Sequence, residues 1–155
     1  MTVGVYEGVT LYFAYGSNMD PAQMRFRCPG AIPEGIAALR GHAFRINRNG
    51  VATVVPAPGA AVRGVLWTLA PAHVDTLDGY EGVAVGEYEK RRLAVEAEAP
   101  AEALIYIASE DRPGVPRAGY LETILAGAEH FRLPPDYIAG LAQWRAGTNS
   151  TGGIE

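Results

Sequence analysis

The sequence predicts an α+β fold in which a small mixed β-barrel is flanked by helices. Two observations favour this class. Strand-like segments come mostly as neighbours joined by short turns. Helical patterns occur after the first strand, in the middle of the chain and at its end. This order favours a mixed sheet curled into a barrel over a doubly wound parallel sheet.

The first predicted strand covers residues 11–15, which are aromatic or apolar without interruption, as expected of a strand buried on both faces. A short helix follows over residues 20–27. Asp20 is expected to cap its first turn, and Pro21 fits the first helical position. The sequence Cys28-Pro29-Gly30 ends this helix.

The next region is predicted to contain four short strands. Two of them, 35–39 and 42–47, meet at Arg40-Gly41, and Asn49-Gly50 is a tight-turn signal. Strand 51–55 ends in the Pro56-Ala57-Pro58-Gly59 turn, and strand 61–69 follows, with apolar residues at a period of two. We expect the last of these strands to pair with the one before it.

The second half of the chain returns to helices. A helix begins at Pro71 and is predicted to end at Asp78-Gly79, before a glycine-punctuated loop over residues 80–88. Strands 88–96 and 103–108 come next. Apolar stripes at helical spacing predict two final helices, one beginning near Tyr120 and one after Pro134-Pro135.

The bulk properties predict one domain over residues 1–146, because a chain of 155 residues with 48% hydrophobic composition can bury a single core. Residues 147–155 contain few apolar side chains and are predicted to be disordered. The net charge is −4, and the charges are scattered without a basic stripe, so nucleic acid is not an expected partner.

No apolar run approaches the ~20 residues that span a bilayer, and the first residues lack the layout of a signal peptide, so no membrane association is expected and a cytoplasmic location is predicted. Cys28 is the single cysteine and has no histidine close in sequence, which favours a packed, inert thiol over a nucleophile. The histidines His42, His73 and His130 are far apart, so no metal site is predicted.

Two loops could carry chemistry at one mouth of the predicted barrel. The first is Gly16-Ser17-Asn18, where backbone N–H groups near a helix start could hold a carboxylate or an oxyanion, although a purely structural turn would look similar. The second contains Glu81, between Tyr80 and Gly82. Apolar surroundings would raise its pKa into a range useful for proton transfer, but a solvated glutamate at a helix end is the commoner case.

Taken together, these loops resemble those of the gamma-glutamylcyclotransferase family. The matching pieces run in the family's order through residues 10–142. They are Tyr12-Phe13-Ala14-Tyr15-Gly16-Ser17-Asn18, Gly64-Val65-Leu66-Trp67, Leu77-Asp78-Gly79-Tyr80-Glu81-Gly82-Val83 with Gly86 and Tyr88, and Pro116 to Tyr120 leading into Gly127-Ala128. Met19 stands where the family often has leucine, which leaves the loop chemistry unchanged.

The resemblance implies a cofactor-independent reaction in which the α-amine of a gamma-glutamyl compound attacks its own side-chain carbonyl and releases 5-oxoproline. Glu81 aligns with the family's catalytic glutamate. Tyr15, Gly16, Ser17 and Asn18 would hold the glutamyl portion. Tyr88 and Tyr120 would line the pocket, although Tyr120 also begins an apolar stripe and could belong to the core.

The resemblance leaves the substrate and part of the function open. The substrate could be a free gamma-glutamyl amino acid, a gamma-glutamyl amine or a protected antibiotic precursor. An acyl or gamma-glutamyl transferase and a non-catalytic binder of gamma-glutamyl-like metabolites are the alternatives. The family often pairs, so a homodimer is one expected state.

Overall fold

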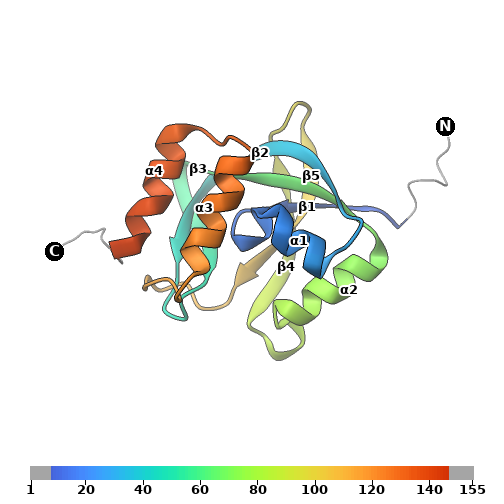
Figure 1. Ribbon diagram of the computed structural model, residues 1–155, viewed down its shortest axis with the longest axis horizontal. Coiled ribbons are helices and arrows are strands. Elements are labelled where there is room, and N and C mark those ends of the chain that lie inside the picture. Colours follow the sequence, from blue (N-terminus) through green and yellow to red (C-terminus); the bar gives the residue numbers. More distant parts are fainter. Residues whose placement is uncertain (1–7, 147–155) are drawn as a thin grey trace.

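Five strands form one sheet in a computed structural model that describes residues 8–146, and four helices pack around it (Figure 1). The strand order is β2-β3-β1-β5-β4. The strands are β1 (Thr10–Ala14), β2 (Ile32–Ile46), β3 (Ala52–Leu69), β4 (Tyr88–Val95) and β5 (Ala101–Ala108). The helices are α1 (Pro21–Arg27), α2 (Pro71–Tyr80), α3 (Tyr120–His130) and α4 (Pro135–Ala142). The predicted α+β class is confirmed.

Strand β1 is the centre of the sheet and makes it mixed, because it pairs antiparallel with β3 and parallel with β5. Phe13 and Ala14 are almost inaccessible to solvent, as expected for a strand with neighbours on both sides and helices nearby. Strand β4 pairs antiparallel with β5. The chain therefore leaves the middle of the sheet at the end of β1, directly before the loop that begins with Tyr15.

The four short strands predicted between residues 35 and 69 are two long strands instead. Pairing jumps from Arg40 opposite Ala61 to His42 opposite Pro56, so residues 57–60 bulge outward across from Gly41. Prolines and glycines interrupt the ladder there without ending either strand, because both strands bend together at the bulge. The predicted pairing of 61–69 with 51–55 is wrong: this part of β3 pairs with β1 and with the first part of β2.

The predicted barrel is not closed. The two edge strands approach each other at a single antiparallel bridge between Ala38 and Glu96, with N–H···O distances of 2.8 and 2.9 Å. One bridge does not make a continuous ladder, so the fold is an open mixed sheet. Short-range sequence patterns report where strands run, but closure depends on how two edges distant in sequence meet.

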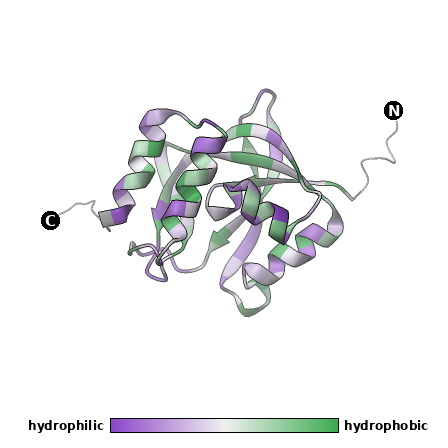
Figure 2. Cartoon of the chain, viewed as in Figure 1, coloured by the Kyte–Doolittle hydropathy of each residue, from purple (hydrophilic) through white to green (hydrophobic). Residues whose placement is uncertain are grey.

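The helices begin where the sequence predicts and pack their apolar stripes inward. The Asp20 side chain accepts from the Gln23 N–H at 3.3 Å and so caps α1. Leu121, Ile124 and Ala128 of α3 are buried in the core, and α3 and α4 each carry both hydrophobic and hydrophilic residues (Figure 2). Helix α2 runs past its predicted end at Asp78-Gly79, and Gly82 adopts the left-handed conformation, with φ of 63°.

Within residues 8–146 no helix is both long and apolar enough to cross a membrane. The tail predicted to be disordered, residues 147–155, lies outside the described residues.

Candidate active site

All seven residues singled out from the sequence line one inner cavity of about 30 Å³. They come from the end of β1, the turn that follows it, the end of α2 and the starts of β4 and α3. The predicted residues are Tyr15, Gly16, Ser17, Asn18, Glu81, Tyr88 and Tyr120, and the cavity is completed by Tyr12, Ala52 and Tyr106. The sheet and helices thus bring together side chains that are more than 100 positions apart in sequence.

The loop after β1 contains a one-turn 3₁₀ helix over Ser17–Met19, where the sequence predicted only a turn before α1. Its first backbone hydrogen bond runs from the Met19 N–H to the Gly16 carbonyl, at 3.0 Å. The N–H groups of Ser17 and Asn18 precede that bond and have no acceptor in the part of the chain that the structure describes. The start of α1 is different, because the Asp20 carboxylate already occupies it. The candidate anion-binding groups are therefore those of the 3₁₀ turn.

Close packing holds this turn in place from two sides. A Cβ atom on Gly16 would lie 3.2 Å from the Ala52 Cβ, which shows how near β3 comes to the loop. A Cβ atom on Gly127 of α3 would lie 2.5 Å from the Met19 carbonyl carbon, so α3 can pack against the turn only with a glycine there. The Gly127-Ala128 pair of the family pattern is explained by this approach.

Side chains from α1 fix the polar atoms of the turn. The Gln23 Nε2 group donates to Ser17 Oγ at 2.6 Å and to Asn18 Oδ1 at 2.9 Å. Arg27 also donates to Asn18 Oδ1, at 3.2 Å, and the Asn18 amide donates to the Tyr12 hydroxyl at 2.9 Å. Asn18 is buried, and these bonds satisfy both ends of its amide.

Glu81 lies directly after α2, with its N–H bonded to the Leu77 carbonyl at 2.8 Å. The side chain is partly buried. The pKa of the Glu81 carboxyl is raised to about 7, chiefly by burial; the nearby charge of Arg27 opposes this change, and the charge of Glu87 adds to it. A carboxyl with such a pKa can both take and return a proton near neutral pH.

The backbone of Ala52 positions two of the predicted tyrosines. The Tyr88 hydroxyl donates to the Ala52 carbonyl at 2.7 Å, and the Tyr120 hydroxyl accepts from the Ala52 N–H at 3.0 Å. Tyr120 also packs against the core. The sequence left open whether it is a core residue or a pocket residue, and it is both: its ring packs in the core and the residue lines the cavity.

Sequence reasoning missed Tyr12, Ala52 and Tyr106. Tyr12 and Tyr106 lie on the adjacent strands β1 and β5, and their rings meet edge to face with centroids 5.8 Å apart. Both were interpreted as ordinary strand residues, because an aromatic side chain on a buried strand is usually a packing residue. The sequence did contain one signal of a polar site. Phenylalanine would pack equally well at these two positions, and a buried tyrosine hydroxyl needs a hydrogen-bond partner.

A second cavity, of about 470 Å³, adjoins the first. The two share the lining residues Ser17, Glu81, Tyr88 and Tyr120. This outer cavity is also lined by Gln23, Arg27, Tyr80, Arg117 and Thr123. The Arg27 guanidinium lies over the Tyr80 ring, 4.2 Å from its centroid, and the Arg117 Nε donates to the Asn49 carbonyl at 2.8 Å. Neither arginine is in an ion pair with another of the described residues, so the lining of the outer cavity carries two arginines against the single carboxyl group of Glu81.

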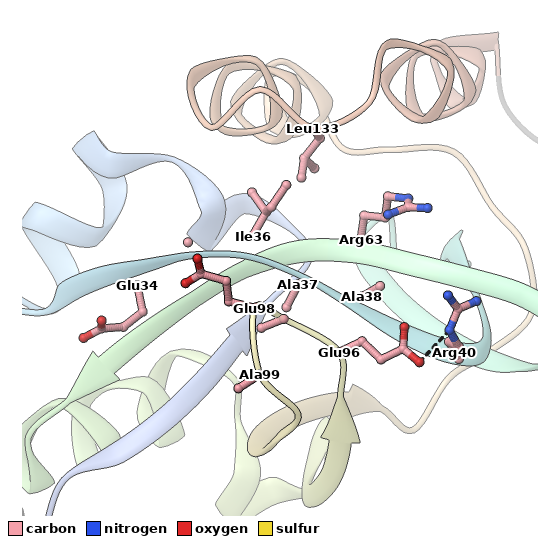
Figure 3. A pocket seen from close by; sticks show the side chains of 12 residues that line it. Glu34, Ile36, Ala37, Ala38, Arg40, Arg63, Glu96, Glu98, Ala99 and Leu133 are labelled. Carbon is pink, nitrogen blue, oxygen red and sulfur yellow. Dashed lines mark ion pairs between the residues drawn. The ribbon is translucent and has the colours of Figure 1, made fainter.

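A larger cavity, of about 510 Å³, lies elsewhere and contains none of the predicted site residues (Figure 3). It opens where the edge of β2 passes the turn between β4 and β5, next to the bridge of Ala38 and Glu96. Its charged side chains are exposed apart from the half-buried Arg63, and Arg40 and Glu96 form an ion pair with Nε and Oε2 2.8 Å apart. We assign no chemistry to this cavity.

Cys28 lies in the core, where burial raises the pKa of its thiol to about 11. A thiolate is therefore disfavoured, in agreement with the inert thiol expected from the sequence. Among the described residues, no group of three or more His, Cys, Asp and Glu side chains is arranged to hold a metal ion.

Comparison with known proteins identifies the family of this chain. A model of the AIG2-like family matches residues 61–141. Gamma-glutamylcyclotransferase of Mus musculus is 30% identical over 146 residues, which cover 84% of this chain and 77% of the mouse protein. The Homo sapiens protein of the same name is 30% identical over 139 residues, 82% of this chain and 74% of the human one. A solved structure named gamma-glutamyl cyclotransferase superposes with a TM-score of 0.81 at 27% identity, covering 86% of each chain. The chain therefore belongs to the gamma-glutamylcyclotransferase family of AIG2-like enzymes.

Proposed function

We propose that this enzyme cyclises a gamma-glutamyl compound, with Glu81 as the general acid and base. Glu81 takes a proton from the substrate's α-ammonium group, and the resulting amine attacks the side-chain carbonyl carbon. The tetrahedral intermediate then collapses: the bond to the leaving nitrogen breaks as Glu81 returns its proton to that nitrogen. Glu81 also takes the second proton of the attacking nitrogen and passes it to the released amine, so the ring nitrogen keeps one N–H and the amine leaves as an ammonium. The products are 5-oxoproline and an amine or amino acid, and no cofactor or net oxidation is required.

The position and environment of Glu81 carry this proposal. Its side chain borders both cavities, so it lies between the space for the reacting end of the substrate and the space for the leaving group. Burial raises its pKa to about 7, which makes it a stronger base than an ordinary carboxylate while leaving it able to donate a proton. A carboxylate that only bound a cation would gain nothing from this raised pKa, since the anionic form binds best.

The turn over Ser17–Met19 supports the same reaction. As the amine attacks, negative charge develops on the carbonyl oxygen and must be stabilised by donors that are already in place. The N–H groups of Ser17 and Asn18 lie at the inner cavity without acceptors among the described residues, and they are held there by Gln23, Arg27 and α3. Ring closure is intramolecular, so a cavity that holds the glutamyl chain folded supplies much of the rate advantage.

The outer cavity is proposed to take the leaving group. Its volume of about 470 Å³ is enough for an amino acid or a small amine, and Arg27 and Arg117 would favour a leaving group with a carboxylate.

The test is release of 5-oxoproline from gamma-glutamyl-alanine and gamma-glutamyl-ethylamide by the parent enzyme and by Glu81→Gln. We expect the substitution to lower kcat by ~10²-fold or more while substrate binding persists, because general acid and base catalysis is worth about that much. Glu89→Gln, at an exposed position on β4, is the matched control and should retain parent turnover.

Other results would redirect the assignment. Parent turnover in Glu81→Gln would remove Glu81 as the base. A transferred acyl product without 5-oxoproline would support acyl or gamma-glutamyl transfer in its place. Binding of gamma-glutamyl compounds with no product after long incubation would support a non-catalytic binder.

A further inference from the structure

Five tyrosines line the inner cavity, and the hydrogen-bond partner of each hydroxyl determines whether it can donate or accept toward a ligand. The Tyr15 hydroxyl bonds to the Tyr106 carbonyl, and the Tyr88 hydroxyl bonds to the Ala52 carbonyl at 2.7 Å. A carbonyl oxygen can only accept, so both hydroxyl protons are committed to the protein. What remains available at Tyr15 and Tyr88 is the lone pairs of the oxygen.

The Tyr106 hydroxyl also donates its proton to a protein acceptor, which here is a carboxylate. Its hydroxyl donates to Asp78 Oδ1 at 2.7 Å, and the other carboxylate oxygen accepts from the Lys90 ammonium at 2.9 Å. Both carboxylate oxygens of Asp78 thus act as acceptors, one from Tyr106 and one from Lys90. Tyr106 is therefore an obligate donor to Asp78 and, like Tyr15 and Tyr88, has only lone pairs left for a ligand.

The other two tyrosines have the opposite polarity. Tyr120 accepts from the Ala52 N–H at 3.0 Å, and a backbone N–H can only donate. Tyr12 accepts from the Asn18 amide nitrogen at 2.9 Å. The orientation of that amide is fixed, because Arg27, which has no acceptor, bonds to the opposite atom, Asn18 Oδ1. The hydroxyl protons of Tyr12 and Tyr120 are thus free to be donated.

The five hydroxyls keep their protons and lie near Glu81. Burial raises the pKa of all five phenols, so each stays neutral at physiological pH. Glu81 lines the same cavity as the five tyrosines, and its charge adds to the increase in every one of them. The cavity therefore has an acceptor side, defined by Tyr15, Tyr88 and Tyr106, and a donor side, defined by Tyr12 and Tyr120.

We propose that the acceptor side, together with Glu81, binds the α-ammonium group of the substrate, and that Asp78 is the positioning residue that keeps Tyr106 an acceptor. This proposal rests on the proposed function, which supplies the ammonium. An ammonium group carries donors and no acceptor, so it matches oxygens whose own protons are engaged elsewhere. The donor side is left for the substrate's oxygen atoms. The separation of donor and acceptor hydroxyls also orients the substrate. In a reversed glutamyl group the ammonium would face the donors Tyr12 and Tyr120, which offer it no favourable hydrogen bond.

The experiment compares two probes that differ only in the α-amine. Gamma-glutamyl-alanine and glutaryl-alanine, which lacks the amine, are titrated calorimetrically into the Glu81→Gln protein, where turnover does not interfere. Adding Tyr106→Phe should weaken binding of gamma-glutamyl-alanine by roughly tenfold to a hundredfold, as expected when a hydrogen bond to a charged group is lost. Binding of glutaryl-alanine should change by less than about twofold, because it makes no such bond.

Two further variants separate the ammonium site from a structural effect. Asp78→Asn should give the same selective loss, because an amide can donate to Tyr106 and turn its hydroxyl proton toward the ammonium. Tyr137→Phe removes the hydroxyl of a buried tyrosine that does not line this cavity and should leave both affinities unchanged. Circular dichroism on each variant establishes that it is folded, and Tyr88→Phe repeats the test if Tyr106→Phe is not.

The outcomes distinguish the two proposals. Equal weakening of both probes by Tyr106→Phe would overturn the ammonium site, whatever the enzyme's activity. A selective loss in a protein that releases no 5-oxoproline would support the ammonium site and overturn the proposed cyclisation. Failure of the Glu81→Gln protein to bind either probe would overturn the ammonium site, and turnover of gamma-glutamyl-alanine by the parent would then decide the cyclisation by itself.

Discussion

Replacing Glu81 by glutamine should make the folded state more stable, and the gain should increase with pH. Burial raises the pKa of Glu81 from its ordinary value of 4.5 to about 7, so ionisation of this carboxyl opposes folding. The cost is absent below pH 4.5, grows as the pH rises from 4.5 to 7 and is constant above that range. At about 1.36 kcal/mol for each pH unit, the full cost is on the order of 3 kcal/mol at most. A glutamine is neutral throughout and avoids it.

Urea unfolding at pH 5 and pH 8 measures this difference, with fluorescence of the buried Trp67 as the signal. The stability gain of Glu81→Gln over the parent should be about 2 kcal/mol larger at pH 8 than at pH 5. Glu89→Gln, on the exposed face of β4, is the control for the loss of one negative charge. An equal gain for Glu81→Gln at both pH values, or a loss at pH 8, would refute the assignment of Glu81 as a buried carboxyl with a raised pKa.

Substitutions at Arg27, Arg117, Gly64 and Gly140 test the site and the packing around it. Arg27→Gln removes the charge that lowers the pKa of Glu81, so the acid limb of the pH profile of kcat/KM should move up by roughly one pH unit. Arg27→Lys keeps the charge and should return the limb to its parent position. An unmoved limb in Arg27→Gln would contradict an effect of Arg27 on the pKa of Glu81. Arg117→Gln should raise KM for gamma-glutamyl-alanine by roughly threefold to fivefold and leave KM for gamma-glutamyl-ethylamide unchanged, in steady-state assays; equal effects would remove Arg117 from carboxylate recognition. Gly64→Ala should destabilise the fold by about 2 kcal/mol or more, because its Cβ would lie 2.3 Å from the Ala14 carbonyl oxygen. Gly140→Ala, in an open position of α4, should stabilise the folded state by about 0.5–1 kcal/mol. Thermal melts measure both glycine variants. A higher melting temperature for Gly64→Ala than for Gly140→Ala would contradict the close contact of β1 and β3 at Gly64.

Local signals in the sequence were sufficient wherever a structure depends on residues close together in the chain. The cap at Asp20 and the apolar stripe of α3 depend on spacings of three or four residues, and both are confirmed. The sequence patterns of the β2–β3 region predicted strand ends wrongly, because Gly41 and the Pro58-Gly59 pair are usual ends of strands and here lie within a bulge that both strands share. Whether such residues end a strand or bend it depends on the partner strand, which the local sequence does not specify.

Some features of the candidate site could likewise be predicted from the sequence, and others depend on the fold. The loop of Gly16, Ser17 and Asn18 and the helix end at Glu81 could be found because the order of the motifs matches a family. Local sequence favoured a solvated Glu81, since nothing near it in the chain shows that strands and helices bury it. The raised pKa of Glu81 arises from that burial, with Arg27 and Glu87 as opposing neighbours, and so belongs to the tertiary structure.

The sequence by itself determined where the four helices begin, the apolar stripes that they bury and the family to which the chain belongs. Only the tertiary structure decided that the sheet stays open and that Tyr12 and Tyr106 join the cavity. It also decided the direction of each tyrosine hydrogen bond. The physical reason is that the polarity of a hydroxyl is set by its partner, and partners such as Ala52 and Asp78 reach these tyrosines from other elements of the fold.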